Sequence, residues 1–194
     1  RVVGAALSKQ VFMKDLKVYG ISADTYWNFS YFAGLFLETS AFRLGVDRDD
    51  SYMVGLLHAI GKVVLNESLN PEDVKILWDP SFPSSEWEMI MFGLHQEEAG
   101  AFLLEKWKFP ESIFGRIRRQ ADPSAQSEDP VLGALAYITD VMNQNHLDFD
   151  REFWILPEIH PFYDQSQSAP DDWQSTIART RLDMNQVRKS IARD

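Results

Sequence analysis

Histidine side chains are the first candidates for chemistry in this sequence, because the chain contains four histidines and no cysteine. The missing cysteines exclude disulfides, zinc–thiolate sites and cysteine nucleophiles. His58 is the most informative histidine, since it lies in the otherwise apolar stretch Gly-Leu-Leu-His-Ala-Ile-Gly-Lys at 55–62. An imidazole in such surroundings needs a hydrogen-bond partner or a ligand. The residues alone leave both interpretations of His58 open, a bonded core histidine and part of a binding site.

Other motifs of hydrolytic enzymes are missing from the sequence. His95 is followed by Gln-Glu-Glu, without the second histidine that the zinc-binding His-Glu-x-x-His motif requires. The chain has neither a Gly-x-Ser-x-Gly elbow nor a glycine-rich phosphate loop. His146 and His160 fall near an expected helix end and in an expected loop, and we expect both side chains to be solvated.

The net charge and the hydropathy of the sequence argue against nucleic acids and membranes as binding partners. The net charge is −10, so a phosphate backbone would be repelled and nucleic-acid binding is not expected. No stretch approaches the roughly 18 apolar residues of a membrane-spanning helix. The first residues, Arg-Val-Val-Gly, have no signal-peptide layout, and we expect a cytoplasmic chain that begins inside a larger protein. Basic residues near the C-terminus suit the negative end of a helix dipole; they are Arg179, Arg181, Arg188, Lys189 and Arg193.

The elements that position these residues are expected to be helices. The sequence has no Asn-Gly or Asp-Gly hairpin signal, whereas caps such as Asp129 before Pro130 mark helix starts. We predict a polar linker at 121–129 and a long loop at 157–169. Helices are predicted at about 2–18, 24–44, 52–65, 70–78, 84–93, 96–107, 110–120, 130–145 and 170–191.

Large rings crowd the segment that precedes the last predicted helix. We expect them to cover the helical core, because large aromatic side chains are mostly buried. The alternative is an exposed contact surface. The rings belong to Phe149, Phe153, Trp154, Phe162 and Tyr163.

Several short stretches follow one another in a specific order. They are Trp-Asn-Phe-Ser at 27–30, Gly-Leu-Leu-His-Ala-Ile-Gly-Lys at 55–62, Gly-Leu-His-Gln-Glu-Glu-Ala-Gly at 93–100 with Trp107 and Pro110, Ile-Arg to Asp-Pro at 117–123, and Leu-Ala-Tyr-Ile-Thr-Asp at 135–140. In this order the stretches resemble the HDOD branch of the HD superfamily of metal-dependent phosphohydrolases. The resemblance is strongest over residues 27–140. It implies that the N-terminal part of the family domain is absent, and it leaves 150–194 as a C-terminal extension without an assigned role.

The departures from the superfamily pattern bear on function. In the enzymes an adjacent His-Asp pair holds one metal or two metals bridged by the Asp, and the metal activates water and clamps phosphate oxygens. Here Ala59 stands in place of that Asp, Phe29 in place of the first His, and Gln120 and Ala121 where further histidines are expected. Methyl and phenyl groups cannot coordinate a cation. The resemblance leaves three residual metal-site positions, which are His58, His95 and Asp140.

These three side chains allow two arrangements. Two imidazoles and one carboxylate can hold a single Fe, Mn or Zn ion with open coordination positions. They can equally form a hydrogen-bonded network that needs no metal. Loss of the bridging carboxylate removes charge that a divalent ion requires, so we expect no cofactor and no catalytic residues.

The resemblance implies an all-α, HD-like bundle of about eight helices, organised as a single domain over 1–194. It also implies a non-catalytic signal-transduction module of bacterial type that acts through protein partners, with self-association as one option. The main alternative is a divergent mononuclear metal phosphohydrolase that acts on nucleotides or cyclic dinucleotides. A third interpretation is a former substrate pocket that now senses a small ligand.

Overall fold

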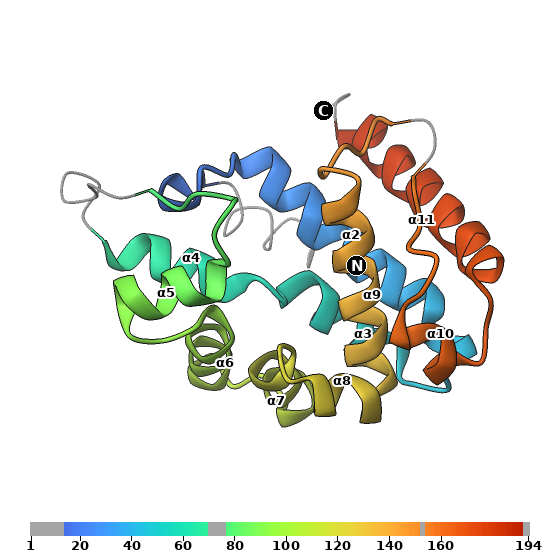
Figure 1. Ribbon diagram of the computed structural model, residues 1–194, viewed down its shortest axis with the longest axis horizontal. Helices are drawn as coiled ribbons and strands as arrows, with labels where there is room; N and C mark the ends of the chain where they lie inside the picture. Colours follow the sequence, from blue (N-terminus) through green and yellow to red (C-terminus); the bar gives the residue numbers. More distant parts are fainter. Residues whose placement is uncertain (1–13, 70–76, 152–153, 192–194) are drawn as a thin grey trace. The chain divides into compact units, whose positions relative to one another are not determined.

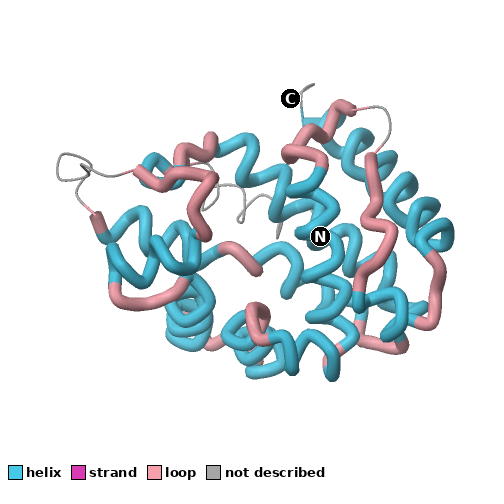
Figure 2. Tube along the Cα trace, viewed as in Figure 1, coloured by secondary structure: helices cyan, strands magenta, loops and turns pink. Residues whose placement is uncertain are grey.

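The computed structural model describes residues 14–69, 77–151 and 154–191. Within these ranges the chain is helical, as predicted, and the only extended pairing is a single bridge between Leu16 and Ile21. Figure 2 shows helices joined by loops of different lengths. The helices predicted at 2–18 and 70–78 fall largely outside the described residues. The elements are η1 (Lys17–Tyr19), α2 (Ala23–Leu44), α3 (Arg48–Leu57), α4 (Ile60–Ser68), α5 (Ser84–Phe92), α6 (Gln96–Lys106), α7 (Glu111–Arg119), α8 (Pro123–Glu128), α9 (Pro130–Gln144), α10 (Pro161–Ser166) and α11 (Pro170–Ile191).

The chain divides into two compact units. Unit 1 comprises residues 1–28 and 58–118, and unit 2 comprises residues 29–57 and 119–194. Helices α4 to α6 and nearly all of α7 belong to unit 1, whereas α3 and α8 to α11 belong to unit 2 (Figure 1). No helix of the described residues is long and apolar enough to cross a membrane.

The predicted helix over 52–65 is broken at His58 and Ala59, which form a turn between α3 and α4. In an unbroken α-helix the carbonyl of Ala59 would accept the amide of residue 63. Instead it accepts the Lys62 amide at 3.0 Å and the Tyr26 hydroxyl at 2.8 Å. A tertiary hydrogen bond therefore accompanies a break that the apolar pattern does not reveal. At the start of α3, the Asp47 carboxylate accepts the Asp50 amide at 2.8 Å.

Two short helices occupy segments for which we predicted irregular structure. The linker predicted at 121–129 contains α8, and the loop predicted at 157–169 contains α10. Each begins with a proline preceded by a side chain that accepts an amide of the first turn, Asp122 from Ser124 at 2.9 Å and His160 from Phe162 at 3.1 Å. Such caps stabilise a helix start even in a polar sequence.

Aromatic rings form part of the core of unit 2, as predicted for Phe149, Trp154 and Phe162, whereas Tyr163 is half-buried. Phe32 contacts Phe149 and Trp154 with ring centroids 5.6 and 4.9 Å apart. Phe162 lies 5.2 Å from Tyr137, and each of these five side chains is less than a tenth exposed. Phe153 lies outside the described residues.

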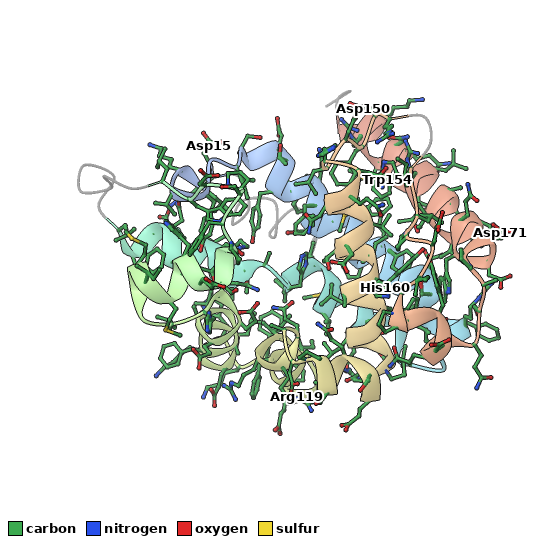
Figure 3. All side chains as sticks on the ribbon, viewed as in Figure 1. Asp15, Arg119, Asp150, Trp154, His160 and Asp171 are labelled. Atoms are coloured by element: carbon green, nitrogen blue, oxygen red, sulfur yellow. The ribbon has the colours of Figure 1, made fainter. Side chains whose placement is uncertain are left out.

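Part of the C-terminal extension is held by its own basic residues. Arg181 of α11 donates to the carbonyls of Phe149 and Arg151 and stacks on the Trp154 ring at 5.3 Å. Arg188 pairs with Asp150 at 3.0 Å; Figure 3 labels Asp150 and Trp154 in this region. Burial lowers the pKa of Arg181, and the nearby carboxylates of Asp148 and Asp150 oppose that shift. These contacts pack α11 against Phe149, Arg151 and Trp154, and Arg188 also lies in the last turn of α11.

Candidate functional site

The signature residues His58 and Ala59 are buried in the turn between α3 and α4. His58 is 4% exposed and Ala59 is 1% exposed. Ala59, which the resemblance aligns with the acidic ligand of the superfamily's enzymes, therefore carries a buried methyl group. A carboxylate there would need a cation or several hydrogen-bond donors to offset its desolvation.

The glycines of two signature stretches mark the place where α4 and α6 cross. A Cβ atom on Gly61 would lie 1.8 Å from the carbonyl oxygen of Gln96. A Cβ atom on Gly100 would lie 3.1 Å from the Gly61 nitrogen. The two stretches that resemble the family in sequence are therefore in contact within unit 1, and their small residues permit the backbones to approach closely.

Glu88 of α5 forms a buried polar cluster that the sequence analysis did not identify. Its Oε1 atom accepts the Tyr19 hydroxyl at 3.0 Å and pairs with Lys62 Nζ at 3.1 Å. Its Oε2 atom accepts the backbone N–H of Gln96 at 2.9 Å. Burial, together with the neighbouring Glu88 carboxylate, raises the pKa of the Tyr19 phenol, so Tyr19 remains a donor. A glutamate inside the apolar run Trp-Glu-Met-Ile-Met-Phe was the available sequence signal.

His95 is the N-cap residue of α6. Its backbone N–H faces the carboxylate of Glu98 at 3.5 Å, and the side chain is half-buried. The sequence Glu97-Glu98 places two acidic residues in the first turn, where they complement the helix dipole. His95 thus has a local structural role at the start of α6.

The side chains of Asp140 and His160 form a pair that was not predicted from the sequence. The His160 Nε2 and Asp140 Oδ2 atoms are 3.3 Å apart, and the side chains are 12% and 66% exposed. Since His160 Nδ1 accepts the Phe162 amide, a neutral His160 carries its proton on Nε2 and donates it to Asp140. The expectation that the His160 side chain is simply solvated is therefore wrong. His160, labelled in Figure 3, directly precedes α10 in the sequence. His146, by contrast, is exposed as expected.

The remaining positions carry side chains unsuited to a metal. Phe29 is half-buried, and the half-buried Gln120 accepts the Gln126 side-chain amide through its backbone carbonyl at 2.6 Å. Among residues 14–69, 77–151 and 154–191, no group of three or more histidine, aspartate or glutamate side chains is arranged to hold a metal ion. The phenyl ring of Phe29 and the methyl group of Ala59 supply no atom that could coordinate a cation.

Comparison with known proteins identifies the family. The model of the HDOD domain matches residues 2–123, which is more than half of the chain. The chain belongs to the HDOD domain family. The HDOD match starts upstream of the resemblance seen at 27–140 and ends before Asp140. His58 and His95 therefore lie inside the matched region, whereas Asp140 lies beyond it.

A protein of Treponema pallidum (strain Nichols), called an uncharacterized protein, is similar to this HDOD chain. The two are 30% identical over 138 residues, which cover 68% of this chain and 26% of the relative. The chain thus matches about a quarter of the length of that protein. No solved structure matches the sequence.

Proposed function

We propose that this HDOD chain is a non-catalytic regulatory module that acts through contacts with other proteins. One observation carries the proposal: Ala59, which the resemblance aligns with the metal-bridging Asp of the superfamily's enzymes, is buried and only 1% exposed. Without that carboxylate, the negative charge that holds a divalent ion and the group that bridges two ions are both missing.

The surroundings of the other residual positions support the same proposal. His95 begins α6 as its N-cap residue, and Asp140 accepts a hydrogen bond from His160. The Asp140 side chain thus has a structural task that needs no metal, and the His95 backbone N–H faces Glu98 at the start of α6. The remaining ligand positions that the resemblance indicates hold Phe29, Ala59 and Gln120.

The length of the Treponema pallidum relative supports the proposal that this domain acts beside other segments of a longer protein. In the Treponema pallidum protein the region similar to this chain makes up 26% of the length. A helical domain that occupies a fraction of a longer chain can transmit a signal by packing against its neighbours, and such contacts require no chemistry at the ancestral site.

An activity screen tests the proposal. The purified chain, supplied in turn with Mn²⁺, Fe²⁺ and Zn²⁺, is incubated with a phosphomonoester, a phosphodiester, nucleotides and cyclic dinucleotides. We expect product formation no faster than in samples without protein, and the same result for His58→Ala. Metal-dependent turnover that His58→Ala abolishes would instead establish the mononuclear phosphohydrolase.

A further inference from the structure

Three donor groups of unit 1 contact the single carboxylate of Glu88. The Oε1 atom of Glu88 accepts hydrogen bonds from Tyr19 Oη at 3.0 Å and from Lys62 Nζ at 3.1 Å. Its Oε2 atom accepts the Gln96 amide at 2.9 Å. Its side chain is 1% exposed, whereas that of Lys62 is 18% exposed. A full positive charge, a phenolic O–H and a backbone N–H therefore surround one anionic group close to the protein surface.

The donors belong to elements other than the helix that carries Glu88. Tyr19 ends η1, Lys62 is in the first turn of α4, and Gln96 is the first residue of α6. The close approach of Gly61 to the Gln96 carbonyl holds the neighbouring Lys62 beside the start of α6. The Lys62 ammonium also lies 4.6 Å from the centre of the Tyr19 ring. Lys62 and the Gln96 amide are thus positioned by the α4–α6 crossing, and Tyr19 by η1, rather than by α5.

We propose that Tyr19, Lys62 and the Gln96 amide form an anion-binding site for a carboxylate or phosphate group, and that Glu88 is its resident ligand. A charged lysine combined with an N–H at the start of an eleven-residue helix is a donor set that binds anions. Glu88 closes the site in this structure, so the wild-type chain takes up no external anion there. The site is independent of the residual metal positions and of the regulatory role.

Removal of the resident carboxylate tests the site directly. Glu88→Ala leaves the three donors around a space that fits a small anion, and we expect a lower Tm in chloride. Replacing chloride with sodium acetate or sodium phosphate at equal ionic strength should raise the Tm of Glu88→Ala by roughly 2–4 °C more than that of the wild type. A larger effect of acetate indicates a carboxylate site, and a larger effect of phosphate indicates a phosphate site.

Three further variants separate anion binding from general salt effects. Glu88→Gln fills the space with a neutral side chain and should show no acetate-specific gain. The double variant Glu88→Ala/Lys62→Met should lose the gain, because the charged donor is gone. Glu67→Ala removes a surface glutamate that pairs with Lys14, where the glutamate side chain is 46% exposed, and should respond to acetate as the wild type does.

A refolding assay covers the case in which Glu88→Ala does not stay folded in chloride. Denatured Glu88→Ala is then diluted into acetate, phosphate or chloride, and the folded fraction is measured by circular dichroism. We expect a larger folded fraction in acetate or phosphate. Equal responses of Glu88→Ala to all three salts, in Tm or in refolding, would overturn the proposal and reduce the cluster to a structural ion pair.

Discussion

His160 donates from Nε2 to the carboxylate of Asp140, 3.3 Å away, while its Nδ1 accepts the first-turn amide of Phe162. The contact joins α10 to α9, and it uses both nitrogens of the imidazole. Asp140, which the resemblance placed among the metal ligands, therefore takes part in a structural hydrogen bond. This pair gives Asp140 a packing role within unit 2.

The first prediction concerns this pair. His160→Ala removes the cap of α10 and should lower the free energy of unfolding by about 1 kcal/mol. His160→Asn should recover most of that loss, because Asn is a good N-cap residue. Asp140→Ala should cost less, since 66% of its side chain is exposed. Urea denaturation of the three variants measures each value, and equal costs for His160→Asn and His160→Ala would exclude the capping role.

The second prediction concerns the crossing of α4 and α6. Gly61→Ala places a methyl group against the Gln96 carbonyl and should destabilise the fold by about 3 kcal/mol or more, because the backbones must separate. Gly115→Ala is the matched control in α7, where the nearest atom would be the Glu111 side chain at 3.6 Å. This control should be neutral or stabilising by about 0.5–1 kcal/mol. Similar Tm values for the two variants would contradict the close crossing.

The third prediction concerns alkaline pH. Burial raises the pKa of Tyr19, as does Glu88, and burial with the Tyr163 hydrogen bond raises the pKa of Tyr137 above the ordinary value of 10.0. Below about pH 10 both phenols are protonated in the folded and unfolded chains, so their contribution is constant. Above it the unfolded chain loses protons that the folded chain retains, and stability falls by about 1.4 kcal/mol per pH unit for each phenol.

Thermal unfolding between about pH 9 and about pH 11 measures this decline. Tyr19→Phe and Tyr137→Phe should each make the decline shallower by the contribution of one proton. The Tm at neutral pH should fall in both variants, because each loses a hydroxyl contact. Slopes that match the wild type in both variants would show that these phenols do not titrate differently on unfolding.

The fourth prediction restores the acidic residue of the family signature. Ala59→Asp introduces a carboxylate at a position that is 1% exposed, and should destabilise the chain by roughly 3–5 kcal/mol. Ala121→Asp, at an exposed position, should change stability by less than about 0.5 kcal/mol. Added Mn²⁺ or Zn²⁺ should leave the Tm of Ala59→Asp low. Recovery of its Tm with either metal would mean that the remaining ligands still form a site.

The sequence revealed those helices whose signals are local. Asp129 before Pro130 and Gly93 after Phe92 mark the start of α9 and the end of α5, and the structure confirms both. The break at Ala59 was missed because it involves a bond to Tyr26, which is distant in sequence. The start of α10 was missed because a histidine serves as its cap, which is outside the usual set of capping residues.

The candidate site was predictable only in part for the same reason. His58 was identified because a polar residue in an apolar stretch is visible in the sequence itself. Glu88 was missed because its partners include Tyr19, 69 residues away, and no pattern near Glu88 specifies that contact. Asp140 was assigned by resemblance, and its partner His160 comes from a segment beyond the family match.

Metal content tests the central claim most directly. Tag-free protein, purified without chelators, is analysed by elemental mass spectrometry beside its His58→Ala variant. The proposal of a non-catalytic module predicts iron, manganese and zinc far below the protein concentration in both samples. Near-stoichiometric metal in the wild type that disappears in His58→Ala would contradict the proposal and restore the phosphohydrolase interpretation.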